Sequence, residues 1–287
     1  MKIVIFGLAK SGTTALFYKI KNSLPADAVC LFEPRSFDAE KVKDSRLRWL
    51  SRGKRERDTL AKVLPFRPHH AVDVESFSHF EKQILIVRDP RDRFISRLLY
   101  GIYDSEIVRD ELKIKVLVAT LEQKEADPRS VALKTLLQLV TAQNGQGFSF
   151  DEWTRAYVCH SIVRPLEFHQ EREHLFIFKY EDLVDGHFVE LEEYLGRPLQ
   201  GEARVAPEFN RVTRTRSYGG WRDWFTEEDV DFLRPLMQPY LDCYYPGADW
   251  NLKAVPSISS EHGSRYVLRI TNERRALLRL PAIKTEQ

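Results

Sequence analysis

The sequence predicts an α/β fold with three layers, in which helices cover both faces of a central parallel sheet. Short apolar runs of the length of buried strands alternate with longer segments of helical periodicity. The strands are expected near residues 2–6, 29–33, 70–74, 83–87 and 175–180. The helices are expected near residues 13–23, 40–63, 90–103, 105–125, 130–143, 150–170, 181–195 and 226–243. Because no long flexible linker divides the chain, we expect one domain over residues 1–287, with a helical part at about 98–170 and a C-terminal extension at about 246–287.

The first strand leads into a loop with the composition of a phosphate-binding site. Gly7 and Gly12 keep the glycine spacing of the Walker A pattern G-x-x-x-x-G-K-[ST], and Thr14 keeps its final hydroxyl. Thr13 replaces the lysine of that pattern, and the lysine of this loop is Lys10. Backbone N–H groups and a helix N-terminus at such a loop attract a phosphate, whereas the displaced lysine disfavours metal-assisted transfer of a γ-phosphoryl group. The alternative is an ordinary strand–turn–helix with a hydroxyl N-cap.

The apolar run at residues 83–87 leads into a second candidate site for an anion. Asp89 can cap a helix whose first turn begins with Pro90. Arg88 then lies at the end of the strand, and Ser96 follows about two helical turns later. A guanidinium and a hydroxyl in this arrangement can bind a second phosphate. The other arginines of this helix are expected to be solvated: Arg91, Arg93 and Arg97.

Three segments resemble sequences of the PAPS-dependent sulfotransferases, whose donor is 3′-phosphoadenosine 5′-phosphosulfate (PAPS). Residues 10–14 are similar to the 5′-phosphosulfate loop of that family. Residues 88–96 are similar to its 3′-phosphate motif and have the same spacing of eight between arginine and serine. Residues 214–226 are loosely similar to its segment R-K-G-x-x-G-D-W-K-N-x-F-T, although the family glycine falls on Arg216 and the family aspartate on Gly220.

The resemblance implies a fold like that of the P-loop NTPases and assigns roles to these residues. Lys10 would neutralise the bridging oxygen between phosphate and sulfate as the leaving group departs. The 5′-phosphate would be held by the loop: Ser11, Gly12, Thr13 and Thr14. The 3′-phosphate would be held by two residues of the second motif and one arginine of the third: Arg88, Ser96, and Arg214 or Arg216. Trp221 would cover the nucleotide or pack under the loop. The two anionic ends of PAPS match two separate phosphate sites, and no metal is required.

The transfer also needs a base for the acceptor hydroxyl, and the sequence offers three candidates. Glu33 follows an apolar run, so we expect it at the carboxyl end of the second strand, where open parallel sheets bind ligands. Glu33 could instead pair with Arg35. His70 lies about where many members of the family have a catalytic histidine, although the local pattern differs. We rank Glu33 first, His70 second and Asp73 third.

The composition is that of a soluble globular protein, with 43% hydrophobic and 30% charged residues. The formal net charge of +2 gives no reason to expect a nucleic-acid partner. The cysteines, Cys30, Cys159 and Cys243, match neither a zinc pattern nor a disulfide framework. No apolar stretch approaches the roughly 20 residues of a membrane helix. We therefore expect no transmembrane segment, no metal site, and a cytoplasmic, bacterial enzyme.

The sequence therefore predicts a sulfotransferase that moves a sulfuryl group from PAPS to a hydroxyl, or as a second choice to an amine. Its product would be adenosine 3′,5′-bisphosphate (PAP), and its acceptor a carbohydrate or a small molecule. The basic run at 41–57 could steer an acidic acceptor, although a solvated helix face is the simpler interpretation. The helical part at 98–170 would shape the acceptor pocket. Residues 264–280 look like a basic amphipathic helix or strand, which could dock on the body of the protein, mediate a homodimer or contact an acidic partner.

Two other functions are compatible with the same residues. An ATP-dependent small-molecule kinase with a degenerate P-loop would need an aspartate for Mg²⁺, and Asp73 is its best candidate. A non-catalytic nucleotide-binding module would use the same phosphate contacts without turnover.

Overall fold

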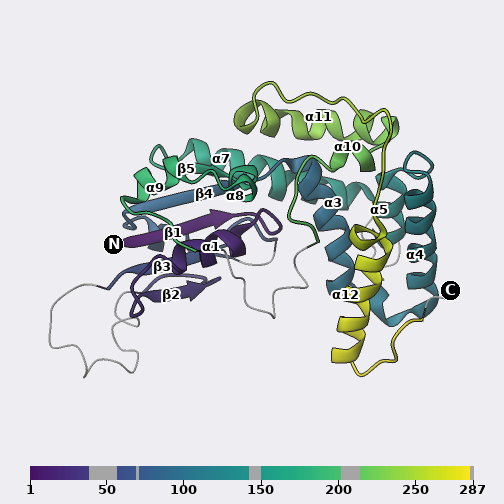
Figure 1. The fold of residues 1–287 in the computed structure, drawn as a ribbon, viewed down its shortest axis with the longest axis horizontal. Helices are drawn as coiled ribbons and strands as arrows, with labels where there is room; N and C mark the ends of the chain where they lie inside the picture. Colours follow the sequence, from purple (N-terminus) through teal and green to yellow (C-terminus); the bar gives the residue numbers. More distant parts are fainter. Residues whose placement is uncertain (39–56, 69–70, 142–149, 202–213, 285–287) are drawn as a thin grey trace. The chain divides into compact units, whose positions relative to one another are not determined.

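The computed structural model describes residues 1–38, 57–68, 71–141, 150–201 and 214–284 (Figure 1). The chain forms two compact units. Unit 1 consists of Met1–Arg88 and Arg164–Pro207, and unit 2 consists of Asp89–Val163 and Glu208–Gln287. The described strands all lie in unit 1, whereas the described part of unit 2 consists of helices and the segments that connect them.

Unit 1 contains a five-stranded parallel sheet with the strand order β2-β3-β1-β4-β5. The strands are β1 (Lys2–Gly7), β2 (Val29–Phe32), β3 (Thr59–Val63), β4 (Lys82–Val87) and β5 (Phe176–Lys179). The strand order reverses at β1, which pairs with β3 on one side and with β4 on the other. Ligands of open parallel sheets bind at the carboxyl ends of the strands beside such a reversal. The predicted fold class, a parallel sheet flanked by helices, is confirmed.

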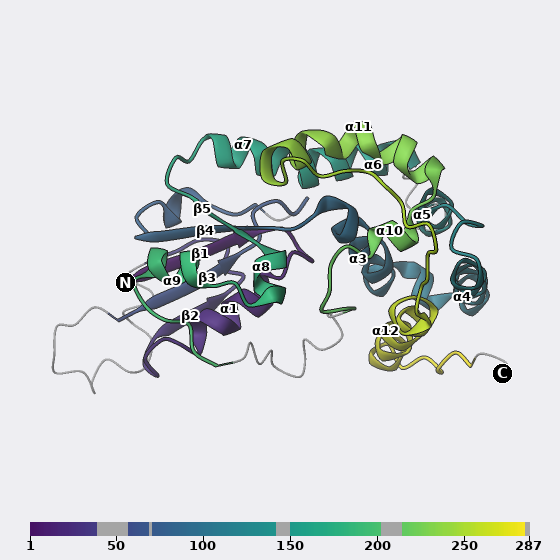
Figure 2. The same cartoon turned by 45° about the horizontal axis from the view of Figure 1, so that its top comes forward.

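Both faces of the sheet are covered by helices. The helices of unit 1 are α1 (Thr13–Lys21), α7 (Arg164–Gln170), α8 (Tyr180–Asp185) and α9 (Val189–Leu195). Ile3 and Ile5 of β1 are fully buried in a core that they share with α1 and α9. Phe6 lies in the alternate set of side chains, and its ring meets those of Phe77 and Phe168 edge-on, with 6.3 Å and 5.0 Å between centroids. Because Phe168 belongs to α7, α7 and α1 cover opposite faces of the sheet (Figure 2).

Strand β3 forms where the sequence pattern predicted the end of a helix. The prediction of helix up to residue 63 is wrong for residues 59–63, whose five side chains are all buried in the sheet. Lys62 interrupts this short apolar run, so the pattern looked like the continuation of a charged helix. Residues 57 and 58 lie in no helix either, and the rest of that prediction, residues 40–56 with nearly all of the basic run, lies outside the described residues.

The strand predicted at residues 70–74 is also wrong in its described part. Residues 71–74 lead into a 3-10 turn at Glu75–Phe77. Asp73 begins this turn, since its Oδ1 accepts a hydrogen bond from the Ser76 N–H at 3.3 Å. A short aspartate side chain that bonds the backbone ahead of it favours a turn over a strand.

Unit 2 is helical in its described part. Its helices are α3 (Pro90–Gly101), α4 (Glu111–Ala126), α5 (Leu133–Thr141), α6 (Phe150–Val158), α10 (Trp221–Trp224), α11 (Glu227–Tyr244) and α12 (Ser264–Leu277). Helix α3 begins as expected, because the Asp89 carboxylate accepts the N–H of Arg91 at 2.9 Å and Pro90 occupies the first turn. Helix α12 settles the C-terminal basic segment as a helix. The described helices include none with the length and apolar character needed to cross a membrane.

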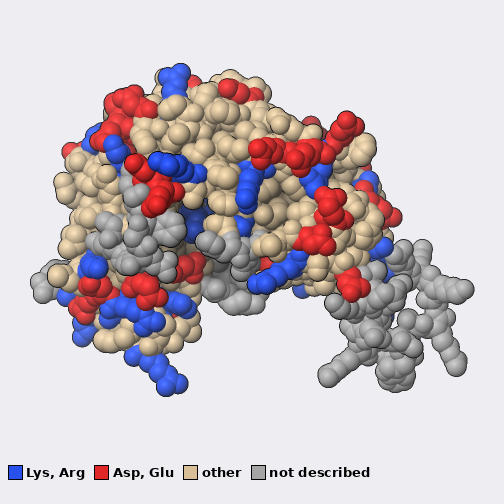
Figure 3. Space-filling model, turned by 180° about the vertical axis from the view of Figure 1, so that it is seen from behind, with Lys and Arg blue, Asp and Glu red and all other residues tan. Residues whose placement is uncertain are grey.

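On the face that Figure 3 shows, Lys and Arg side chains lie interspersed with Asp and Glu side chains. This distribution agrees with the small net charge of +2.

Candidate active site

The loop between β1 and α1 has the backbone of an anion-binding nest. Lys10 has φ 72° and Gly12 has φ 82°, so two residues of this short loop are in the left-handed region. A Cβ on Gly12 would lie 2.5 Å from the ring of Tyr180, and a Cβ on Gly7 would lie 2.7 Å from the side chain of Thr13. Only glycine fits these two places. Because Gly12 is the N-cap and supplies no side-chain cap, the first N–H groups of α1 are available to an anion.

Arg88 supports this loop from the end of β4. Its Nη1 donates a hydrogen bond to the carbonyl oxygen of Lys10 at 2.9 Å, and its guanidinium lies 4.1 Å from the centre of the Tyr180 ring. Arg88 is 5% exposed, and Ser11 of the loop is fully buried. Among the described residues, Arg88 Nε, Arg88 Nη2 and Ser11 Oγ are buried and have no hydrogen-bond partner. Buried donors without partners are rare and costly, so these donors fit a ligand whose anionic groups would accept from them.

Lys62 of β3 links the loop to the candidate base. Its Nζ donates to Thr14 Oγ1 at 2.9 Å and to Glu33 Oε1 at 2.8 Å. The second carboxylate oxygen of Glu33 accepts from Arg67 Nη1 at 2.9 Å. Glu33 directly follows β2, its φ is 54°, and its N–H bonds the carbonyl oxygen of Lys62 at 2.8 Å. The structure therefore places Glu33 at the carboxyl end of the sheet, as predicted, with Lys62 and Arg67 as its ion-pair partners where the sequence suggested Arg35.

The charges of this cluster act on one another. Burial by itself would raise the pKa of Glu33, but the hydrogen bonds and charges of Lys62 and Arg67 outweigh it and lower that pKa. Burial lowers the pKa of Lys62, and the Glu33 carboxylate opposes this effect. Glu33 is therefore held as a carboxylate near neutral pH.

The other two candidate bases are Asp73 and His70. Asp73 is exposed and caps a turn. His70 lies outside the described residues.

In unit 2, Asp92 joins helix α3 to the third predicted segment. The Asp92 carboxylate is buried and accepts the backbone N–H groups of Gly219 and Trp221, the latter at 2.9 Å. Ser96 lies one turn further along α3 and is 4% exposed. The structure thus brings together, within unit 2, the helix of the second motif and the segment around residue 219.

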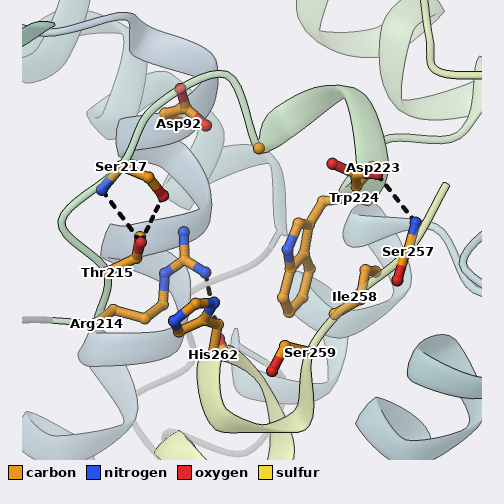
Figure 4. A pocket seen from close by; sticks show the side chains of 11 residues that line it. Asp92, Arg214, Thr215, Ser217, Asp223, Trp224, Ser257, Ile258, Ser259 and His262 are labelled. Atoms are coloured by element: carbon orange, nitrogen blue, oxygen red, sulfur yellow. Dashed lines mark hydrogen bonds between the residues drawn. The ribbon is translucent and has the colours of Figure 1, made fainter.

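Arg214 lines a cavity of about 150 Å³ in unit 2 (Figure 4). The cavity is lined by residues of α3, of the segment 214–224 and of the segment 257–262. Arg214 Nη1 donates to the carbonyl oxygen of His262 at 3.2 Å, and the guanidinium lies 5.6 Å from the Trp224 ring centre. Burial and the Arg214 charge lower the pKa of His262. Arg216 is exposed, so Arg214 is the better placed of the two candidate arginines to bind a ligand inside this cavity.

Trp221 is buried by neighbouring side chains of unit 2. Its exposed fraction is 1%, and the Arg91 and Arg222 guanidinium groups lie 4.0 Å and 4.6 Å from its ring centre. These contacts give Trp221 a packing role, and its predicted contact with a nucleotide stays a prediction.

The expectation that the arginines of α3 are solvated is wrong for two of them. Arg91 and Arg93 are 3% and 2% exposed, because Arg91 pairs with Asp89 and stacks on Trp221 while Arg93 bonds the Tyr157 hydroxyl at 3.3 Å. Arg97 is exposed, as expected.

Lys62, and the contact of Arg67 with the candidate base, were not predicted from the sequence. The available signal for Lys62 was a lysine inside a short apolar run, which indicates a buried charge with a partner if the run is a strand.

The sequence model of the family described as "Sulfotransferase domain" matches residues 1–218, which is more than half of the chain. The chain therefore belongs to the sulfotransferase family. Among solved structures, the chain is similar to the crystal structure of mouse sulfotransferase SULT7A1 complexed with PAP, with 16% sequence identity, a TM-score of 0.49 and 84% of each chain covered. No curated protein matches the chain.

Proposed function

We propose that this chain transfers a sulfuryl group from PAPS to a hydroxyl, or as a second choice an amine, of a carbohydrate or a small molecule. Membership of the sulfotransferase family supports sulfuryl transfer in general. The observation that carries the choice of donor is the set of buried donors without partners, Ser11 Oγ in the phosphate loop and two nitrogens of Arg88 at the end of β4, which the two phosphates of PAPS would satisfy.

The loop residues bind and orient the donor. The first N–H groups of α1, with the hydroxyls of Ser11, Thr13 and Thr14, hold the 5′-phosphate. Lys10 neutralises the charge that develops on the bridging oxygen between phosphate and sulfate. PAPS supplies the activated sulfuryl group.

We assign the 3′-phosphate to Arg88, Ser96 and one of Arg214 or Arg216. The cavity that Arg214 lines supports Arg214 over Arg216. In unit 1, the free donors on Arg88 support its part in this assignment.

Glu33 acts as the base for the acceptor. Its carboxylate takes the proton of the acceptor hydroxyl while the acceptor oxygen bonds to sulfur and the bond between sulfur and the bridging oxygen breaks, with the electron pair going to PAP. Its lowered pKa keeps Glu33 ionised at neutral pH, which is the state a base needs. We retain His70 as the second candidate, and the helical part at 98–170 as the source of the acceptor pocket.

Transfer of labelled sulfate from PAPS tests the proposal directly. The purified chain should label at least one member of a panel of sugars, phenols and amines, and Lys10→Ala should abolish labelling. Lys21→Ala, at an exposed position in the last turn of α1, is the matched control and should keep full activity. In parallel, PAP should raise the unfolding temperature, whereas ATP with Mg²⁺ should not. A rise with ATP that depends on Mg²⁺ would favour the kinase, and binding of PAP without labelling in the panel would favour a binding module.

A further inference from the structure

Lys62 is a buried ammonium group shared by the phosphate loop and the candidate base. Its side chain is 3% exposed, and its Nζ lies 3.9 Å from the centre of the Phe32 ring. Its two oxygen partners come from different elements, Thr14 from the first turn of α1 and Glu33 from the end of β2. A buried ammonium is stable only while such partners are present, so a change in its contact with one partner alters the strength of its contact with the other.

The contact with Thr14 prepares the loop for an anion. A hydroxyl that accepts a hydrogen bond from an ammonium becomes a stronger donor through its own hydrogen, because hydrogen bonds in a chain polarise one another. Thr14 is one of the hydroxyls assigned above to the 5′-phosphate. An anion in the loop would therefore be linked to Lys62 through Thr14, and it would draw the ammonium toward the loop.

The contact with Glu33 restrains the base. Lys62 and Arg67 each occupy one carboxylate oxygen, at 2.8 Å and 2.9 Å. Among the described residues, the charged groups that act on the pKa of Glu33 are Lys62 from β3 and Arg67 from the segment after it. A carboxylate paired in this way is ionised but a weak base. If an anion in the loop attracts the Lys62 ammonium and weakens its ion pair with Glu33, the proton affinity of Glu33 rises and Glu33 becomes a better base.

We propose that Lys62 is a positioning residue that couples the phosphate loop to the base, restraining Glu33 as an ion pair until an anion bound beside Thr14 takes a share of its charge. The inference rests on the proposed function, since it takes the loop as the donor site and Glu33 as the base. It predicts that donor binding and activation of the base are one coupled event.

Binding of PAP tests the coupling without any measurement of activity. Coupling between two sites is reciprocal, so removal of the Glu33 charge should leave more of the Lys62 charge for the anion. Calorimetry should show PAP binding roughly tenfold more tightly to Glu33→Gln than to the wild type, within the usual range of such couplings. In the Lys62→Met background the same Glu33→Gln change should have no effect on PAP affinity. Direct repulsion between Glu33 and PAP would give the gain in both backgrounds, and that result, or no gain at all, would overturn the inference.

Two further variants keep the test decisive if Lys62→Met does not fold. Thr14→Val removes the hydroxyl that links Lys62 to the loop, so the tenfold gain from Glu33→Gln should disappear in that background as well. Arg67→Gln removes the other partner of Glu33, whose side chain is 41% exposed, and it should preserve the gain. Loss of the gain in Arg67→Gln, or its persistence in Thr14→Val, would count against Lys62 as the link.

The pH profile of the reaction gives an independent reading. The acidic limb of kcat/KM for PAPS reports the pKa of Glu33 in the free protein. The acidic limb of kcat/KM for the acceptor at saturating PAPS reports the pKa of Glu33 after the donor has bound. In the wild type the second limb should lie at higher pH than the first. In Lys62→Met the first limb should move to higher pH and the two should coincide. Coincident limbs in the wild type would refute the coupling, while sulfate transfer and binding of PAP would leave the proposed function standing.

Discussion

Replacing Arg88 by methionine should abolish donor binding while leaving the stability of the free protein almost unchanged. The variant loses the hydrogen bond from Nη1 to the Lys10 carbonyl and the contact with the Tyr180 ring. Together these losses cost about 2.5–5 kcal/mol. The variant also removes two buried nitrogens that have no partner in the described structure, and each such group is worth about 1–3 kcal/mol. The free energy of unfolding should therefore change by no more than about 2 kcal/mol.

Binding of PAP should respond far more strongly. Loss of two charge-assisted hydrogen bonds, each worth about 1.5–3 kcal/mol, lowers affinity by a factor of about 100 or more. At a PAP concentration of about 100 times the wild-type Kd, the wild type gains about 2.7 kcal/mol of stability. The variant, at or below half-saturation, gains no more than about 0.4 kcal/mol. For a chain of this size the wild-type gain corresponds to roughly 5 °C in Tm, so a thermal unfolding assay with and without PAP separates the two.

The control and the refuting results follow from the same contacts. Arg109→Met changes an arginine whose side chain is 55% exposed in an ion pair with Glu106, and it should keep the full PAP shift. A full PAP shift in Arg88→Met would show that Arg88 does not bind the donor. A loss of more than about 2 kcal/mol without ligand would mean that the Arg88 contacts are mainly structural.

Three further changes test the phosphate loop of unit 1, the bonds of Asp92 to residues 219 and 221 within unit 2, and the candidate base. Gly12→Ala places a Cβ 2.5 Å from the Tyr180 ring at φ 82°, and it should lower the free energy of unfolding by about 1–3 kcal/mol and remove the PAP shift. The control Gly186→Ala, at φ 77° with nothing within 4 Å, should cost only the backbone strain of about 1 kcal/mol. Equal losses of the two variants in urea unfolding would contradict the steric argument. Asp92→Asn gives up a charged acceptor of two backbone N–H groups and should lower the urea midpoint by the equivalent of about 1–3 kcal/mol, and an unchanged midpoint would dismiss this role. Glu33→Gln should be less stable than the wild type at pH 7. Because the pKa of Glu33 is lowered in the folded protein, the stability that its charge contributes is present above the ordinary value of 4.5 and is lost as pH falls through the lowered pKa. The difference in unfolding free energy should therefore shrink below about pH 4.5, and a difference that stays constant down to pH 3 would count against the ion pairs.

The parts of the site that the sequence predicts are those whose signals are local. The strand β1, its loop and helix α1 follow one another within residues 2–21, and glycine spacing, apolar strand and helix start can all be recognised there. The same holds for β4, Arg88 and the Asp89–Pro90 start of α3, where cap and proline mark the boundary. Positive φ at Gly12 is also local, since glycine is the residue that adopts it without strain.

The parts that the sequence could not predict depend on partners far along the chain. Lys62 is a stable strand residue only because Thr14 and Glu33 lie beside it, 48 and 29 positions earlier in the sequence. Periodicity describes neighbours within a few residues, so a lysine in a short apolar run indicated a helix. Arg91 was misassigned for the same reason, because the Trp221 ring that covers it lies in another segment.

The same contacts argue for Glu33 over Asp73 as the base. A base in this reaction must lie close to the sulfuryl group, and the position of that group is set by the loop that holds the 5′-phosphate. Glu33 is connected to that loop through a single side chain, since Lys62 bonds both Glu33 and Thr14. Asp73 is exposed, and its carboxylate bonds the backbone of its own turn. If Asp73→Asn lowered kcat as much as Glu33→Gln at pH 7, this reasoning would be wrong, because Asp73 has no such connection through Lys62 to the donor loop.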